Sequence, residues 1–215
     1  MIRHLNAAKI CQKTYSSDMR ENPNKRTLIV KSNRELYIAI RGTCDVSDWK
    51  NNFKCIKTKD DIHKGFRDYA LSCLHELIED NAFNLMRKSK HITICAHSLG
   101  GTASIIIIAI LLSKFDFMQK KNVDVVLFGS PKPGGSKFIK RFNELLSTNP
   151  NVKVYRYVNQ YDYVDMYPPL NNYEHVCEEI LLSPITHYNA FDIMNNHAMA
   201  SYVHNLEFKL FNSNF

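Results

Sequence analysis

Short runs of apolar, β-favouring residues alternate along the chain with longer segments in which apolar residues recur every three or four positions. The short runs predict strands at residues 26–31, 35–41, 92–95 and 153–159, and a further strand that starts at 124 and leads into a rigid loop ending at 135. The longer segments predict helices at residues 66–86, 103–112, 136–146 and 197–208, after a short helix within the first 25. Strands that alternate with helices favour an α/β fold, with a mainly parallel central sheet and helices on both faces.

The composition is that of an ordinary globular domain. The 215 residues are 45% hydrophobic and 23% charged, with only seven Gly and seven Pro. No internal repeat, low-complexity tract or linker-like segment interrupts them, so we expect residues 1–215 to form a single domain.

Membrane, secretion and metal signals are weak throughout the sequence. The N-terminal residues contain no apolar core of signal-peptide length, and the longest apolar run, residues 103–112, is too short to span a bilayer. The six cysteines show no metal-ligand spacing. We therefore expect an intracellular protein with reduced thiols and no metal site, although the sequence leaves a bridge between Cys44 and Cys55 open.

The chain is basic, with 28 Lys and Arg against 21 Asp and Glu and a net charge of +7. The positive residues are scattered, without the dense or aromatic-interleaved patch of a nucleic-acid binder, so we expect no nucleic-acid partner. Peripheral contact with an anionic lipid surface is compatible with this charge, but a solvated basic face without a partner is the commoner outcome.

The segment from residue 91 to residue 112 changes character around one serine. A buried-strand pattern gives way to Ala96-His97-Ser98-Leu99-Gly100-Gly101 and then to the apolar helix. Strand, tight turn and helix with Ser98 at the turn are the context of a G-x-S-x-G nucleophile elbow, although Ala96 replaces the first Gly. The alternative is that Ser98 is an ordinary helix N-cap, so the presence of partners elsewhere must decide.

A nucleophilic serine needs a base to take its proton and an acid to orient that base. After an elbow serine, the acid and then the base follow along the chain. The candidate acids are Asp116, Asp124, Asp162, Asp165 and Asp192. Asp162 is favoured because it follows a predicted strand and precedes a Pro-Pro stop, with Asp165 as the near competitor.

Four histidines follow the serine as candidate bases: His175, His187, His197 and His204. His197 opens the predicted C-terminal helix, where a side chain can face the edge of the sheet. His204 lies seven residues later on nearly the same helical face and is the second choice.

Six motifs, spread in order over residues 36–202, resemble those of the class 3 lipases, the fungal-lipase-like α/β hydrolases. They are I-A-I-R-G-T with a downstream D-W, H-K-G-F, A-H-S-L-G-G, L-F-G-S-P-K-P-G, N-Q-Y-D-Y-V-D-M-Y-P-P and H-A-M-A-S-Y. The resemblance implies an α/β-hydrolase fold, with Ser98 as nucleophile, Asp162 as orienting acid and His197 as general base. No cofactor is implied.

The resemblance also assigns roles to the polar segment that follows the second predicted strand. Thr43 and the backbone N–H of Leu99 would form the oxyanion hole. Residues 45–53 would be the lid, with Trp49 at the position of the family's tryptophan, whereas a lone Trp more commonly anchors a loop to the core. The polar lid argues against strong activation at an oil interface, and Val164-Asp165 stands where relatives commonly have Val-Pro.

The leading hypothesis is therefore a serine carboxylester hydrolase that cleaves lipid esters through an acyl-enzyme. Acylglycerols and phospholipids are both open as substrates, as in triacyl-, diacyl- and monoacylglycerol lipases and phospholipases A1. The alternatives are an inactive hydrolase fold that binds lipid or protein, and a soluble short-chain esterase. Serine, acid, base and oxyanion residue are all present, which argues against the inactive fold.

Overall fold

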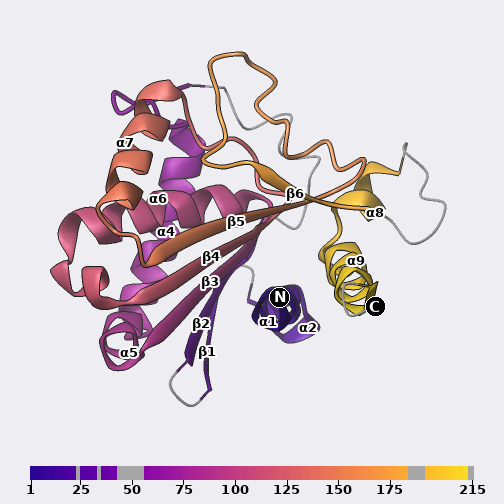
Figure 1. Ribbon diagram of the computed structural model, residues 1–215, viewed down its shortest axis with the longest axis horizontal. Coiled ribbons are helices and arrows are strands. Elements are labelled where there is room, and N and C mark those ends of the chain that lie inside the picture. The colour runs from indigo at the N-terminus through magenta and orange to yellow at the C-terminus, as the bar shows by residue number, and fades with distance from the viewer. Residues whose placement is uncertain (23–24, 33–34, 43–55, 184–191, 213–215) are drawn as a thin grey trace.

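A computed structural model describes residues 1–22, 25–32, 35–42, 56–183 and 192–212 (Figure 1). Within these residues, six strands form one sheet in the order of the chain. The strands are β1 (Thr27–Ser32), β2 (Glu35–Ile40), β3 (His91–His97), β4 (Asn122–Phe128), β5 (Val152–Asn159) and β6 (Glu179–Leu182). β1 is antiparallel to β2, and every other neighbouring pair is parallel. The predicted α/β fold with a mainly parallel sheet is confirmed.

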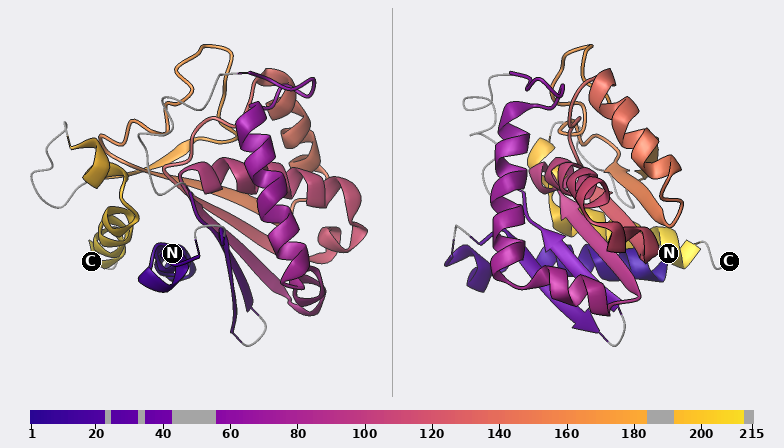
Figure 2. Two further views of the ribbon diagram at one scale, coloured as in Figure 1. Left: turned by 180° about the vertical axis from the view of Figure 1, so that it is seen from behind. Right: turned by 90° about the vertical axis from the view of Figure 1, so that its left-hand side faces the viewer.

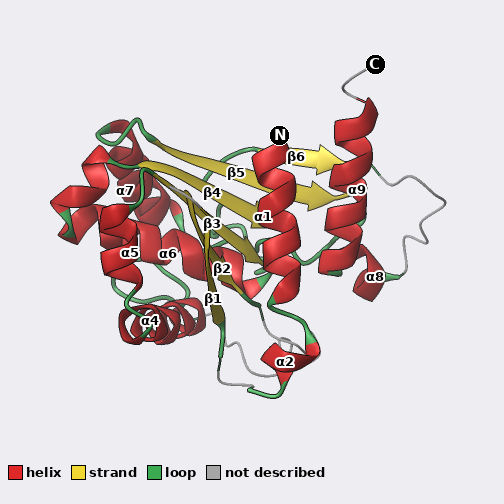
Figure 3. Cartoon of the chain, turned by 90° about the horizontal axis from the view of Figure 1, so that it is seen from below, coloured by secondary structure: helices red, strands yellow, loops and turns green. Residues whose placement is uncertain are grey.

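Helices cover both faces of this sheet. α1 (Ile2–Lys13) and α9 (Met199–Asn212) lie side by side on one face (Figure 3). α4 (Lys64–Glu79), α6 (Leu99–Lys114) and α7 (Ser136–Ser147) lie on the other, coloured purple, pink and salmon in the right-hand view of Figure 2. The shorter elements are α2 (Ser17–Arg20), α5 (Ala82–Lys88), the 3-10 helix η1 (Asp116–Lys120) and α8 (Ile193–His197).

The alternation of side chains along each strand divides the core in two. On β2, Leu36, Ile38 and Ile40 pack against α4 and α6, whereas Tyr37 and Ala39 face the cluster made with α1 and α9. Both sets are at most 4% exposed, so this strand is apolar on both faces, as the central strands of an α/β sheet must be.

Two predicted helices differ from the observed ones. The single helix expected over residues 66–86 is wrong, because the chain turns at Asn81, which has φ 59°, between α4 and α5. Asparagine tolerates this left-handed conformation better than most residues, so it ends one helix and admits another. The C-terminal helix begins at Met199 rather than His197, since Ala198 is extended and His197 is the last residue of α8.

β6 was not predicted from the sequence. It contains four residues and lies at the edge of the sheet beside β5, where so short a strand leaves little periodic signal. The described cysteines, Cys11, Cys73, Cys95 and Cys177, are free thiols, and Cys44 and Cys55 lie outside the described residues.

None of the helices described is long and apolar enough to cross a bilayer. Across the same residues, no three His, Cys, Asp or Glu side chains gather in a way that would hold a metal ion.

Candidate active site

Ser98 lies at a sharp turn between the sheet and a helix. β3 ends at His97 and α6 begins at Leu99, and Ser98 between them has φ 59° and ψ −132°. Such a positive φ is strained for a residue with a side chain and persists where the surroundings impose it. The Ser98 side chain makes no capping hydrogen bond to α6, so it is not an ordinary N-cap.

Small residues around Ser98 allow strand and helix to approach closely. A Cβ added to Gly100 would lie 2.3 Å from the carbonyl oxygen of Ile40, and one added to Gly101 would lie 2.5 Å from Cβ of Ser130. Gly42, just beyond β2, meets Ser98 in the same way, with its added Cβ 2.7 Å from Ser98 Cβ. The close packing around this turn therefore depends on the absence of a side chain at Gly42, Gly100 and Gly101.

The structure brings Ser98, Asp162 and His197 together, although 99 and 35 positions separate His197 from the other two. His197 Nε2 lies 2.8 Å from Ser98 Oγ, and His197 Nδ1 lies 2.8 Å from Asp162 Oδ2. All three residues are at most 4% exposed. Because the carboxylate accepts the Nδ1 proton, Nε2 of the neutral ring is free to accept the proton of the serine hydroxyl.

Asp162 is held by three donors. Its Oδ1 accepts from the backbone N–H of Val164 at 2.9 Å, and its Oδ2 accepts from His197 and from the Tyr202 hydroxyl at 2.5 Å. Burial and the neighbouring Asp162 carboxylate raise the pKa of Tyr202 well above its usual value, so this hydroxyl stays protonated and donates. The sequence did not single out Tyr202, although it is the last residue of H-A-M-A-S-Y.

The other candidate acids lie elsewhere. Asp165 is 3.4 Å from the Arg156 guanidinium, Asp124 is paired with His91 at 3.0 Å, and Asp192 accepts from the backbone of Asn195 in α8. Asp116 is exposed in η1.

The other candidate bases lie elsewhere too. His204 is exposed on α9, so the second choice for the base does not reach Ser98. Burial, together with the charges of Arg156 and Lys132, lowers the pKa of His175 to about 3. His187 lies outside the described residues.

The expected oxyanion residues are only partly described. Leu99 is the first residue of α6, where helical N–H groups have no partner within the helix and are available to an anion. Thr43 and Trp49 lie outside the described residues, together with the rest of the expected lid. Gly42 directly precedes Thr43 and approaches Ser98, as noted above. The roles of Thr43, Leu99 and Trp49 stay predictions.

Solved structures of several lipases align with this chain. The lipase from Rhizopus microsporus var. chinensis aligns with a TM-score of 0.69 and 15% identity over 94% of this chain and 85% of that one. Lip2 lipase from Yarrowia lipolytica aligns with a TM-score of 0.65 and 16% identity over 94% of this chain and 88% of that one. A triacylglycerol lipase whose catalytic centre is a serine protease triad aligns with a TM-score of 0.61 and 19% identity over 83% of this chain and 77% of that one. At these identities the likeness establishes the fold.

Sequence comparison gives a more specific result. The toxin TseL of Vibrio cholerae serotype O1 is 27% identical over 107 residues, which is 50% of this chain and only 15% of the toxin. The chain thus spans a small part of that curated relative. The family model for lipase (class 3) matches residues 37–172, more than half of the 215 residues. The chain therefore belongs to the lipase (class 3) family.

Proposed function

We propose that the protein is a serine carboxylester hydrolase that cleaves lipid esters, with Ser98 as nucleophile, His197 as general base and Asp162 as orienting acid. The observation that carries the proposal is the unbroken line of contacts from Ser98 Oγ through the His197 ring to Asp162, 2.8 Å at each step. Membership of the lipase (class 3) family supports an ester hydrolase of the lipase type.

The proposed reaction proceeds in two halves through an acyl-enzyme. His197 Nε2 takes the Ser98 proton as Oγ attacks the ester carbonyl, and the resulting imidazolium is stabilised by Asp162. The tetrahedral oxyanion accepts hydrogen bonds from the Leu99 N–H and from Thr43. Collapse breaks the C–O bond, and the leaving alcohol takes its proton from His197. Water then repeats the sequence to release the acid and restore Ser98.

Lipid surfaces are the proposed location of the substrate. Large apolar side chains are exposed on the two segments that carry Asp162 and His197: Tyr161, Tyr163, Met166, Ile193 and Met194. Exposed large apolar side chains that gather near a site are typical of interaction surfaces. The net charge of +7 favours anionic phospholipid over neutral surfaces, so peripheral membrane contact is part of the proposal. Both phospholipids and acylglycerols are candidate substrates.

The test is hydrolysis of p-nitrophenyl esters of increasing acyl length and of long-chain lipid emulsions. Ser98→Ala should lower kcat by on the order of 10⁴-fold or more. Ser104→Ala is the matched control, because Ser104 is also buried in α6 but donates to the Gly100 carbonyl, and it should keep near wild-type turnover.

The chain-length profile separates the alternatives. Turnover that rises with acyl length and with emulsified substrate supports a lipase, whereas turnover confined to short soluble esters identifies a short-chain esterase. Equal inertness of wild type and Ser98→Ala on every ester would overturn the proposal and favour a lipid-binding or protein-binding hydrolase fold.

A further inference from the structure

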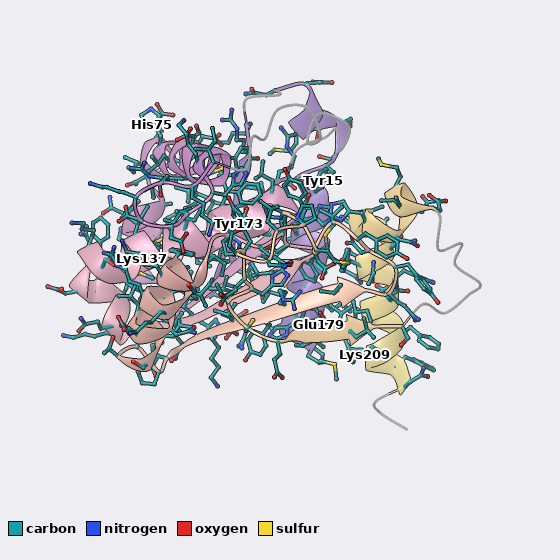
Figure 4. All side chains as sticks on the ribbon, turned by 90° about the horizontal axis from the view of Figure 1, so that it is seen from above. Tyr15, His75, Lys137, Tyr173, Glu179 and Lys209 are labelled. Carbon is teal, nitrogen blue, oxygen red and sulfur yellow. The ribbon has the colours of Figure 1, made fainter. Side chains whose placement is uncertain are left out.

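His97, which directly precedes Ser98, is bonded at both ring nitrogens. Its Nε2 lies 2.7 Å from the carbonyl oxygen of His197, and its Nδ1 lies 2.7 Å from the Tyr15 hydroxyl. The Tyr15 hydroxyl in turn accepts from the backbone N–H of Gly42 at 2.9 Å. Figure 4 labels Tyr15, which comes from the segment just after α1. The His97 ring therefore joins Tyr15 to the backbone of His197, and Tyr15 extends this connection to Gly42.

The chemistry of the partners fixes the direction of each hydrogen bond that runs from Gly42 through Tyr15 and His97 to His197. A carbonyl oxygen can only accept, so His97 Nε2 carries the proton and donates to His197. Neutral imidazole has one N–H, so Nδ1 accepts and the Tyr15 hydroxyl donates to it. The Tyr15 oxygen is then left to accept from Gly42. One tautomer of His97 and one rotamer of the Tyr15 hydroxyl satisfy these three hydrogen bonds.

A charged His97 would break this arrangement and repel the neighbouring base. The two imidazoles lie with ring centroids 4.5 Å apart. Burial lowers the pKa of His97 well below its usual value, and His197 lowers it further. The Asp162 carboxylate is bonded to His197, not to His97. His97 thus stays neutral while His197 can carry the positive charge of the reaction.

We propose that His97 and Tyr15 are positioning residues that hold His197 and the end of β2 in register with Ser98. The proposal rests on the roles proposed above for Ser98 and His197. α8 is only five residues long and ends at His197, so the bond from His97 holds the backbone of the base where the helix stops. The bond from Gly42 holds the residue that leads into Thr43. The backbone of the base is therefore hydrogen-bonded to the His97 ring, and the backbone that leads to the oxyanion residue is connected to the same ring through Tyr15.

A second tyrosine–imidazole pair provides a matched control. The Tyr157 hydroxyl lies 2.8 Å from Nδ1 of His4, and both residues are buried between the sheet and α1. This pair has the same chemistry as Tyr15 and His97 but bonds to no residue of the site. Tyr15→Phe and Tyr157→Phe thus remove the same group from the same kind of bond, with and without a connection to His197.

The experiment measures kcat and KM on a soluble p-nitrophenyl ester and the ¹⁵N shifts of the histidine rings. Tyr15→Phe should lower kcat roughly 10- to 100-fold with little change in KM, because it leaves two buried polar groups without a partner. Tyr157→Phe should keep kcat near that of wild type. His97→Leu should lose at least as much as Tyr15→Phe, whereas His97→Gln, which can still donate to the His197 carbonyl, should recover part of the loss.

The ¹⁵N spectra test the arrangement without any turnover. His97 should show the neutral Nε2–H tautomer at neutral pH, and Tyr15→Phe, but not Tyr157→Phe, should move the His197 signals. A titrating His97, an Nδ1–H tautomer, unmoved His197 signals or equal kcat in the two Phe variants would overturn the proposal. An inert wild type would overturn the proposed function instead, and the spectra would then decide the positioning role alone.

Discussion

Asp162 and Asp165 lie on one loop beyond β5, yet their surroundings differ in kind. Asp162 accepts from a backbone N–H, a tyrosine hydroxyl and an imidazole. Asp165 instead faces Arg156, which also binds Glu179 at 3.1 Å. Burial raises the pKa of Asp165 to about 6, with a further contribution from the Asp162 carboxylate, despite the nearby cation. Glu179 lies on the outer strand and well away from Tyr15 (Figure 4).

The second cluster contains the residue types of a catalytic site without its geometry. It has a buried carboxylate in Asp165, a half-buried histidine in His175 and a buried arginine in Arg156. Its carboxylate is 3.4 Å from a guanidinium, whereas the Asp162 carboxylate is 2.8 Å from an imidazole whose other nitrogen meets a serine. What distinguishes the proposed site is therefore the alignment of a serine, an imidazole and a carboxylate through hydrogen bonds, rather than charge or burial.

The histidines of the two clusters should show the largest difference. His197→Gln should lower kcat by on the order of 10⁵-fold or more, because the serine loses its base. His175→Gln should change kcat by less than about tenfold, since His175 makes no contact with Ser98 in the described structure. Steady-state turnover of the purified variants checks both predictions. Comparable losses of kcat in His197→Gln and His175→Gln would show that the two histidines do not differ in their contribution to catalysis.

The acids should differ nearly as much. Asp162→Asn should lower kcat by on the order of 10⁴-fold, because the amide favours the wrong tautomer of His197. Asp165→Asn should stay within about tenfold of wild type. If Asp165→Asn were the more damaging change, the orienting acid would have been assigned to the wrong residue.

The pH dependence of the free energy of unfolding should reveal the raised pKa of Asp165. The folded pKa of about 6 lies above the ordinary value of 3.8, so the folded state holds the proton more tightly than the unfolded chain. The free energy of unfolding therefore falls as pH rises from about 4 to about 6, by up to about 3 kcal/mol. Urea titrations of wild type and Asp165→Asn across this window should show the Asn variant gaining relative stability as pH rises. A difference in the free energy of unfolding between the two proteins that stays constant across this window would contradict the raised pKa of Asp165.

Among the changes at the proposed site, Tyr202→Phe should have the smallest effect on kcat, well below those of His197→Gln and Asp162→Asn. It removes one of three donors to Asp162 and leaves the Val164 N–H and His197 in place. The loss of one hydrogen bond to a carboxylate should lower kcat about tenfold and leave KM nearly unchanged. Kinetics on the soluble ester measure it, and unchanged kcat would show that two donors are enough to orient the acid.

Sequence by itself determined the local features of this protein. The alternation of β-favouring runs with segments of helical period predicted the α/β fold, because both periods are properties of short stretches of chain. The small residues around Ser98 predicted the turn, and Gly100 and Gly101 are glycines because neighbouring atoms leave no room for a Cβ. The order of serine, acid and histidine left several candidates, of which Asp162 and His197 were favoured by their places after a predicted strand and at a predicted helix start and by the family resemblance.

Tertiary structure alone decided what depends on packing between distant segments. The break at Asn81 and the short edge strand β6 left too weak a signal in the sequence to be predicted. The donors to Asp162 from Tyr202, and the bonds that join Tyr15, His97 and His197, cross from 40 to 100 positions of sequence. Hydrogen bonds of this range exist only after the sheet has aligned its strands and the helices have packed on it, which is why the sequence names candidates and the fold selects among them.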